Sequence, residues 1–121
     1  MKLGLGLAAA VLLWTGCASG PESASTADRE FEQLAAEFTT GYLAWRPATG
    51  TYLGLHEYDG RVSDLSRASI DGEIERLRRF ETKLGALQGG RLSAVNDYDL
   101  RILQSTIRSE LSKLAEKYLT D

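Results

Sequence analysis

The chain has 121 residues, with 14 basic and 17 acidic side chains, one histidine, one cysteine and a formal net charge of −3. A chain of this size buries only about 60 to 70% of its unfolded surface, so it forms one small domain with a modest core. The acidic excess argues against nucleic acid as a partner. A single cysteine excludes an intramolecular disulfide, so packing of the chain itself must provide the stability.

The first sixteen residues have the layout of a secretory signal peptide. Lys2 is followed by an apolar run over residues 3–14 and then by the small residues Thr15 and Gly16 before Cys17. This order of positive charge, apolar run and small-residue cleavage zone is typical of such signals. The run is shorter than the roughly 20 apolar residues that a spanning helix needs. We therefore expect residues 1–16 to be a signal peptide.

The position of Cys17 resembles the lipobox of bacterial lipoproteins, in which the cysteine is acylated and becomes the new N-terminus. Trp14 stands where that pattern prefers leucine. The resemblance predicts lipid attachment at Cys17, a bacterial cell-envelope location and the membrane as a partner. The alternative is ordinary secretion with cleavage after Ala18 or Gly20, which would leave a soluble periplasmic or secreted protein. Residues 17–27 are small and polar and are predicted to form a flexible tether.

The first long helix is predicted to follow this tether, in a helical segment over residues 28–121. Ser25 and Asp28 have the spacing of a helix N-cap. Pro47 ends the helix, because its ring disfavours helical backbone at Arg46. One apolar face recurs at helical spacing, and it comprises Phe31, Leu34, Ala35, Phe38, Tyr42 and Trp45.

Residues 47–64 contain three glycines and connect the first and second long helices. A short helix is expected to start at Pro47, since proline suits the first helical position. Ala48, Tyr52 and Leu55 would line this short helix. An irregular loop follows, with a turn at residues 59–60, where the sequence is Asp-Gly.

The second long helix is predicted to begin between Asp64 and Ser69 and to run to about Leu87, before the glycine pair at residues 89–90. Its apolar seam is spaced by threes and fours and comprises Ile70, Ile74, Leu77, Phe80, Leu84 and Leu87. The charged residues are expected to pair along the surface, Glu75 with Arg79 and Glu73 with Arg76. Arg76, Arg78 and Arg79 therefore fit a solvated helix face better than an anion site.

The third long helix is predicted to start after a Ser93 cap and to continue to the end of the sequence. Its apolar face is expected to comprise Val95, Tyr98, Ile102 or Leu103, Ile107, Leu111, Leu114 and Tyr118. Asp97 and Arg101 should pair on the polar side. The apolar stripe still runs near Asp121, without a C-cap glycine. We therefore expect an all-α fold of three long amphipathic helices plus one short helix and loop, as an incomplete front section of a larger helical fold. The segment from Leu111 to Tyr118 should extend past the shorter preceding helix, and fray or drive self-association.

No residue pattern identifies a reaction. A hydrolytic zinc site usually needs three converging ligands, and the chain has one histidine. His56 and Glu57 match the start of His-Glu-x-x-His, but Gly60 occupies the position of the second histidine. A nucleophile elbow of the Gly-x-Ser-x-Gly type is also missing from the sequence. We therefore expect no catalytic residue and no metal or other cofactor in this chain.

The glycine-rich connection nevertheless concentrates groups that take part in binding and proton transfer. They are Arg46, His56, Glu57, Tyr58, Asp59, Arg61 and Asp64. One interpretation is a substrate-facing loop, because loops often carry such groups. The other is a structural loop in which Asp and His satisfy turn backbone and cap the next helix.

Several short runs follow one another in a recognisable order. They are Tyr42-Leu43-Ala44-Trp45-Arg46-Pro47, then Thr49, Thr51, Leu53-Gly54-Leu55-His56-Glu57-Tyr58-Asp59-Gly60-Arg61, Asp64-Leu65-Ser66, Leu92-Ser93 and Asn96-Asp97-Tyr98-Asp99-Leu100. Together they resemble the N-terminal region of the bacterial domain of unknown function 885 family, many members of which are predicted lipoproteins. The resemblance extends over residues 31–119. Family members are longer, mostly helical and metallopeptidase-like, with a His-Glu motif and a Pro-Gly-His-His motif far toward the C-terminus. None of those C-terminal positions exists in this chain.

The resemblance implies a helical front section of a zinc-dependent hydrolase, without the catalytic part and inactive alone. The missing C-terminal part of the fold would then be a partner, and zinc would belong to full-length relatives. It also favours the interpretation that the loop from His56 to Asp64 faces the substrate. The alternative is a self-contained small helical envelope lipoprotein that acts as a binding module. The sequence leaves open the substrate, the metal, the choice of inner or outer membrane, and the oligomeric state.

Overall fold

The computed structural model describes residues 24–118, and these residues form an all-α fold without strands. The helices are α1 (Thr26–Trp45), α2 (Pro47–Tyr52), the single-turn 3-10 helix η1 (His56–Tyr58), α3 (Arg67–Ala86) and α4 (Ala94–Tyr118). The predicted fold class, with three long helices and one short one, is confirmed. The predicted signal peptide and Cys17 lie outside the described residues.

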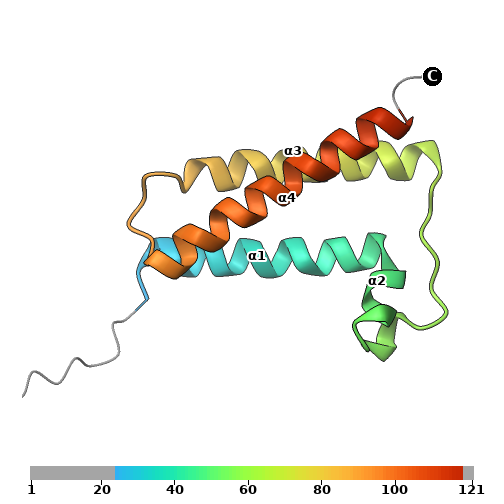
Figure 1. Ribbon diagram of the computed structural model, residues 1–121, viewed down its shortest axis with the longest axis horizontal. Helices are drawn as coiled ribbons and strands as arrows, with labels where there is room; N and C mark the ends of the chain where they lie inside the picture. Colours follow the sequence, from blue (N-terminus) through green and yellow to red (C-terminus); the bar gives the residue numbers. More distant parts are fainter. Residues whose placement is uncertain (1–23, 119–121) are drawn as a thin grey trace, which may run out of the picture.

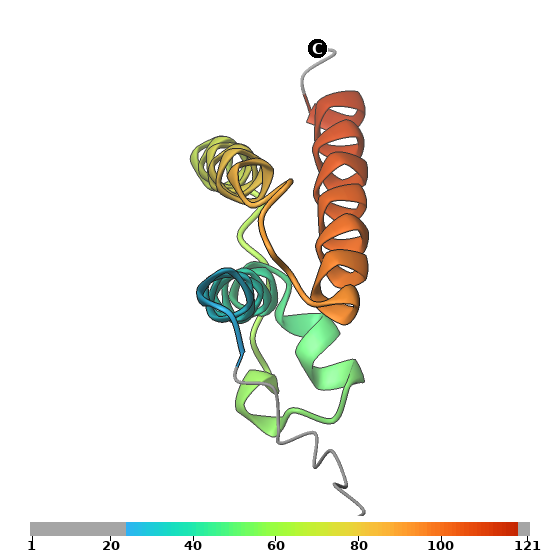
Figure 2. The same cartoon turned by 90° about the vertical axis from the view of Figure 1, so that its left-hand side faces the viewer.

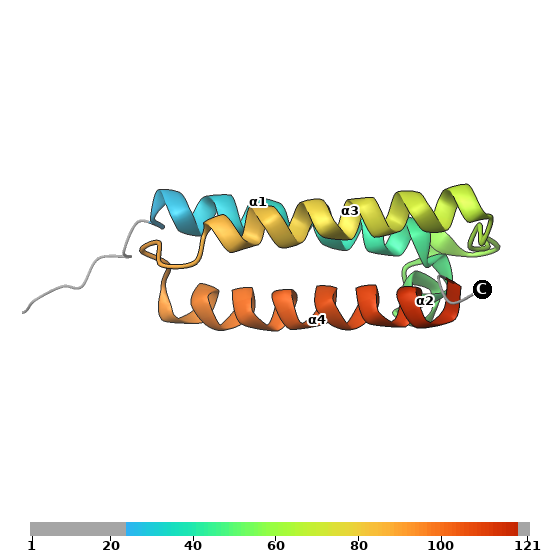
Figure 3. The same ribbon diagram turned by 90° about the horizontal axis from the view of Figure 1, so that it is seen from above.

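The three long helices form two layers. α1 and α3 lie side by side in opposite directions, and α4 covers them from one side (Figure 3). α4 crosses this pair obliquely, from the start of α1 toward the start of α3 (Figures 1 and 2). Each long helix contacts the other two, and the α3–α4 contact is the most extensive. α2 lies at the C-terminal end of α1.

The core lies between the two layers and follows the predicted seams of α1 and α3. All six apolar residues predicted on α3 are buried, and Leu77 and Leu84 are fully enclosed. On α1, Phe31, Leu34 and Phe38 are buried, while Ala35, Tyr42 and Trp45 pack against the core at its edge. The rings of Phe38 and Phe80 meet edge to face, with centroids 5.6 Å apart, an arrangement that aromatic pairs favour.

The apolar face of α4 differs from the prediction in its first turns. Val95 and Tyr98 are 69% and 66% exposed, whereas Leu100 is 1% exposed. The buried stripe comprises Leu100, Gln104, Ile107, Glu110 and Leu114. Val95 and Tyr98 lie on the opposite side of the helix from this stripe. They precede Leu100 by five and two residues, whereas residues on the same face of a helix are three or four apart. Of the two residues considered next along the face, Leu103 packs against the core and Ile102 is half exposed.

The last turns of α4 are covered, contrary to expectation. Leu114 is 3% exposed, and Leu111 and Tyr118 pack against the core. Arg67, the first residue of α3, donates a hydrogen bond from Nη1 to the Tyr118 carbonyl oxygen at 3.3 Å. Because α3 and α4 run in opposite directions, the first turn of α3 lies beside the last turn of α4. The expectation that this end extends beyond its neighbour was wrong.

The N-terminus of α1 carries the predicted cap. The Ser25 side chain accepts a hydrogen bond from the Asp28 N–H, and the Asp28 side chain accepts one from the Ser25 N–H, which makes a capping box. The helix begins at Thr26, so the tether boundary placed at residue 27 was slightly late. Similarly, the Ser93 hydroxyl accepts a hydrogen bond from the Asn96 N–H at the start of α4, as predicted.

Asp28 also joins α1 to α4. Its Oδ1 accepts hydrogen bonds from the Ser93 backbone N–H and from Asn96 Nδ2, each at 2.8 Å. The pKa of the Asp28 carboxyl lies well below its ordinary value of 3.8. The largest cause is the hydrogen bond from the Ser93 backbone and the next is the one from Asn96, whereas burial acts in the opposite direction.

This carboxylate predicts a specific acid sensitivity. Because the pKa of Asp28 is lower in the folded state, its ionised form adds stability above pH 4, and that contribution is lost as the pH falls further. We expect Asp28→Asn to be less stable than the parent at pH 7, with a difference that shrinks between about pH 4 and pH 2. Urea unfolding across this range measures it. Asp71→Asn is the control, since Asp71 forms an exposed pair with Arg67. If the difference in the free energy of unfolding between Asp28→Asn and the parent stayed constant down to pH 2, the ionised Asp28 carboxylate would not be the source of the stability.

Within residues 24–118, the helices are too short or too polar to span a membrane.

Candidate functional site

The loop singled out from the sequence is anchored by α2 and by Tyr58. α2 starts at Pro47 as predicted, but its buried residues are Pro47 and Gly50. The expected face was wrong: Tyr52 is 89% exposed, and Ala48 is exposed as well. The reason is close packing of the Tyr58 ring on Gly50, where a Cβ atom would lie 2.5 Å from a ring carbon. The loop therefore rests on the glycine side of α2.

The polar groups of the loop mostly contact their own neighbours in sequence. His56 Nδ1 lies 3.0 Å from Asp59 Oδ2, and both side chains are largely exposed. Asp64 accepts hydrogen bonds from the Ser66 N–H at 2.8 Å and from the Ser66 hydroxyl at 3.1 Å, directly before α3. The Asp64 contacts agree with the structural interpretation, in which aspartate satisfies turn backbone, whereas Asp59 contacts only the His56 side chain.

The remaining loop residues do not converge on a common point. The Arg61 guanidinium lies over the Tyr58 ring, 5.4 Å from its centroid. Glu57 is exposed. The turn at Asp59-Gly60 is present, with Gly60 at φ +75°, a backbone angle that glycine adopts readily. Whether this surface faces a substrate stays a prediction.

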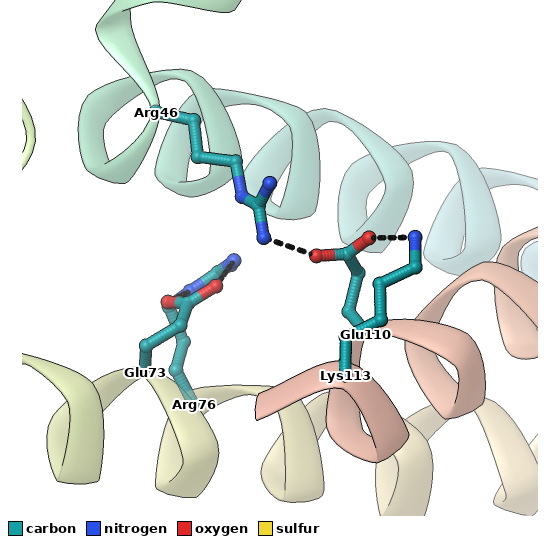
Figure 4. Close-up of polar contacts among 5 residues, drawn as sticks. All are labelled: Arg46, Glu73, Arg76, Glu110 and Lys113. Carbon is teal, nitrogen blue, oxygen red and sulfur yellow. Dashed lines mark hydrogen bonds and ion pairs between the residues drawn. The ribbon is translucent and has the colours of Figure 1, made fainter. Parts of the chain in front are cut away.

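Arg46 belongs to a different group of residues from the rest of the predicted loop. It lies at the junction of α1 and α2, and its Nη2 donates to Glu110 Oε2 of α4 at 2.6 Å (Figure 4). The other oxygen of Glu110 accepts from Lys113 Nζ at 2.9 Å. Glu110 is only 7% exposed. A buried charge is costly unless it is paired, and here two cations compensate it at the edge of the core. The Arg46 guanidinium also lies over the Trp45 ring, at 5.2 Å.

A second ion pair lies beside it on α3. The Arg76 guanidinium donates two hydrogen bonds to the Glu73 carboxylate, at 2.7 and 2.9 Å (Figure 4). This pair was expected on a solvated face, which was wrong, because Glu73 is 5% exposed. Arg76 lies over the rings of Phe38 and Phe80, so α1 covers the pair. A Cβ atom on Gly41 would approach Arg76 Nη1 to 2.7 Å, so a larger residue there would require the guanidinium to shift.

We call these five residues, Arg46, Glu73, Arg76, Glu110 and Lys113, the interhelical ion cluster. Arg46 and Glu110 join the end of α1 to α4, Arg76 of α3 packs on Phe38 of α1, and each carboxylate of the cluster is bound by a cation. Sequence reasoning missed it, although the signal was present: Glu110 and Glu73 lie at positions of the apolar stripes, three residues after Ile107 and Ile70. An acidic residue within an apolar stripe indicates a buried, paired charge.

The surface pairs that the sequence predicted are present. Glu75 lies 3.6 Å from Arg79 on α3. Asp97 and Arg101 are paired in the first turns of α4. Among the described residues, no three His, Cys, Asp or Glu side chains come together as a group able to hold a metal ion.

Comparison of the chain with protein-family models, with curated proteins and with solved structures found no match. The resemblance to the domain of unknown function 885 family therefore stays a prediction from the sequence motifs.

Proposed function

We propose that this chain is the front helical section of an exported, lipid-anchored hydrolase of the metallopeptidase-like kind, with catalytic residues that come from another part of the protein. In this proposal the three helices are a scaffold, and the loop from His56 to Asp64 borders the substrate. The observation that carries the proposal is the side of α4 that faces away from α1 and α3.

This side, which we call the outer face of α4, is uncharged, and it is apolar over the first turns of the helix. It comprises Val95, Tyr98, Ile102, Ser105 and Ser109, which follow one another at intervals of three and four residues, and all five are exposed. Tyr98 is 66% and Ile102 52% exposed. A helix that is apolar on two sides is typical of one covered on both sides. The outer face of α4 therefore supports contact with further protein.

The end of α2 and the connection to α3 also carry exposed apolar residues. They are Tyr52, Leu53, Val62 and Leu65. Single exposed apolar residues are common, but groups of them mark interaction sites. The resemblance of the same segment to the front section of a longer hydrolase family gives this segment a role beside the catalytic part.

Mixing the purified chain with the C-terminal part of a longer member of the domain of unknown function 885 family tests the proposal. We expect a stable complex and peptidase activity that a chelator abolishes, with neither part active alone. The double variant Tyr98→Ser, Ile102→Ser should weaken complex formation at least about tenfold, since each residue then buries less apolar surface. Arg108→Ser, on the same helix and exposed, is the control. A complex indifferent to the double variant would count against the outer face.

A second candidate function is a self-contained helical envelope lipoprotein that binds a partner. The packing of the last described turns of α4 favours it, because Leu114 is 3% exposed and Arg67 is hydrogen-bonded to the Tyr118 carbonyl. This candidate predicts a monomer with a cooperative melt and amide-exchange protection as far as Leu114. Fraying of α4 beyond Leu111, or self-association, would favour the first candidate.

Lipid attachment at Cys17 is common to both candidates. We expect radiolabelled palmitate to enter the protein in a bacterial host and Cys17→Ser to abolish the label completely, since the thiol is the only one in the chain. Ser19→Ala is a control that leaves the cysteine in place. Equal labelling of Cys17→Ser, or a mature N-terminus at Ser19, would instead indicate ordinary secretion.

A further inference from the structure

A cavity of about 190 Å³ lies between the C-terminal end of α1, the segment before α3 and the last turns of α4. The residues that give it its chemical character are Trp45, Arg46, Leu65, Lys113, Lys117 and Tyr118. We call it the basic pocket. It is partly open to solvent and smaller than the roughly 300 to 1,000 Å³ of ordinary ligand pockets, so it suits only a small organic molecule.

The charge of the basic pocket is opposite to that of the chain. Arg46, Lys113 and Lys117 all line it, and none of its lining residues is acidic. Glu110, which binds Arg46 and Lys113, compensates one of these three positive charges. The residues that line the pocket are therefore positively charged as a group, although the net charge of the chain is −3. Such a local excess attracts anions.

The cations remain accessible to a ligand. The side chains of Arg46 and Lys113 are 35% and 63% exposed, although both contact Glu110. Lys117 is exposed and lies over the Tyr118 ring, 5.1 Å from its centroid. The Arg46 guanidinium, whose Nη2 is bound to Glu110, and two ammonium groups from α4 therefore border one small space. Charged N–H donors of this kind bind carboxylate oxygens.

Apart from Ser63, the rest of the lining is aromatic or apolar. The Trp45 indole is held in place, because its Nε1 donates to the Ser69 hydroxyl at 3.1 Å. Leu65 is 55% exposed, and Leu114 closes the cavity toward the core. Small-molecule sites combine mainly apolar walls with a few placed polar groups, and this pocket has that composition.

We propose that the basic pocket binds a small organic carboxylate, whose charged end lies among Arg46, Lys113 and Lys117 and whose apolar end lies against Trp45 and Leu65. The binding requires neither a lipid anchor nor a catalytic part, so it is independent of the function proposed above.

The test uses fluorescence of Trp45 in the full-length chain carrying Trp14→Phe, which leaves one tryptophan. Hexanoate is titrated at constant ionic strength, with hexylamine and hexanol as probes of opposite and no charge. We expect a saturable change with hexanoate alone, and weaker binding at higher salt. Amide chemical-shift changes should map to residues 113–118.

Lys117→Gln should weaken hexanoate binding about two- to fivefold, which corresponds to the loss of one partly exposed charge contact. Lys83→Gln is the matched control, because Lys83 is also exposed and lies over an aromatic ring, Phe80, but on α3 and outside the pocket. It should bind like the parent. The proposal would be overturned if hexylamine or hexanol gave the same response as hexanoate, or if hexanoate gave no saturable response. Equal weakening of hexanoate binding by both lysine variants would also overturn it.

Discussion

Replacing Leu77 with alanine is expected to lower the free energy of unfolding by about 3 to 5 kcal/mol. Leu77 is fully enclosed in the middle of α3, where α1 and α4 both cover the helix. Deleting its isobutyl group removes apolar burial and leaves a cavity that rigid neighbours cannot fill. Because whole domains are stable by only about 5 to 15 kcal/mol, this change alone should partly unfold so small a chain.

Urea unfolding followed by far-ultraviolet circular dichroism measures the effect of Leu77→Ala. Ile102→Ala is the matched control, because Ile102 is 52% exposed on the outer face of α4. The control should change the free energy of unfolding by less than about 1 kcal/mol, as surface substitutions usually do. Similar losses in both variants would show that the core does not lie between the two layers as described.

The fold was predictable where one helix face alone determines burial. On α3, the three-and-four spacing from Ile70 to Leu87 identifies the buried side without ambiguity, and the structure buries all six residues. The end of α1 was equally clear, because Pro47 affects the backbone of Arg46 directly. These features depend on residues close in sequence, so local reasoning found them.

α4 was less predictable because both of its sides carry apolar residues. The pattern Val95, Tyr98, Ile102 is as regular as Leu100, Leu103, Ile107, and only the position of α1 and α3 decides which one is buried. Length alone was a poor guide to the end of this helix. The last turn of α4 is covered because α3 begins beside it. That arrangement depends on the path of the connection between α2 and α3.

In the candidate site, too, contacts between residues close in sequence were predictable and contacts between distant residues were not. Asp59 and Asp64 bind neighbours within three residues, so the structural interpretation of the loop was available from sequence. Arg46 binds Glu110, 64 residues away, and Asp28 binds Ser93, 65 residues away. Such contacts depend on the packing of whole helices. The acidic residues at stripe positions indicate that a partner exists, and the fold determines which one.

Within the interhelical ion cluster, Glu110 is the carboxylate that binds cations from two different elements, and its loss should be costly. Glu110→Gln is expected to lower the free energy of unfolding by about 1.5 to 3 kcal/mol, the range for hydrogen bonds to charged groups. The glutamine cannot offer two acceptor oxygens to Arg46 Nη2 and Lys113 Nζ. Arg46 Nε is already buried without a hydrogen-bond partner. Since the Arg46 side chain is 35% exposed, water moderates the loss below the about 3 to 5 kcal/mol of a fully buried pair.

The matched control for Glu110→Gln is Glu75→Gln, which breaks the exposed pair with Arg79 on α3. It should cost no more than about 0.5 kcal/mol. The double variant Arg46→Met, Glu110→Leu should recover most of the stability, because replacing a buried pair with apolar groups avoids an unpaired charge. Urea unfolding of the four chains measures these differences, and Trp45 fluorescence reports on the α1–α2 junction. A double variant less stable than Glu110→Gln would mean that the charges hold the three helices in a way that packing cannot replace.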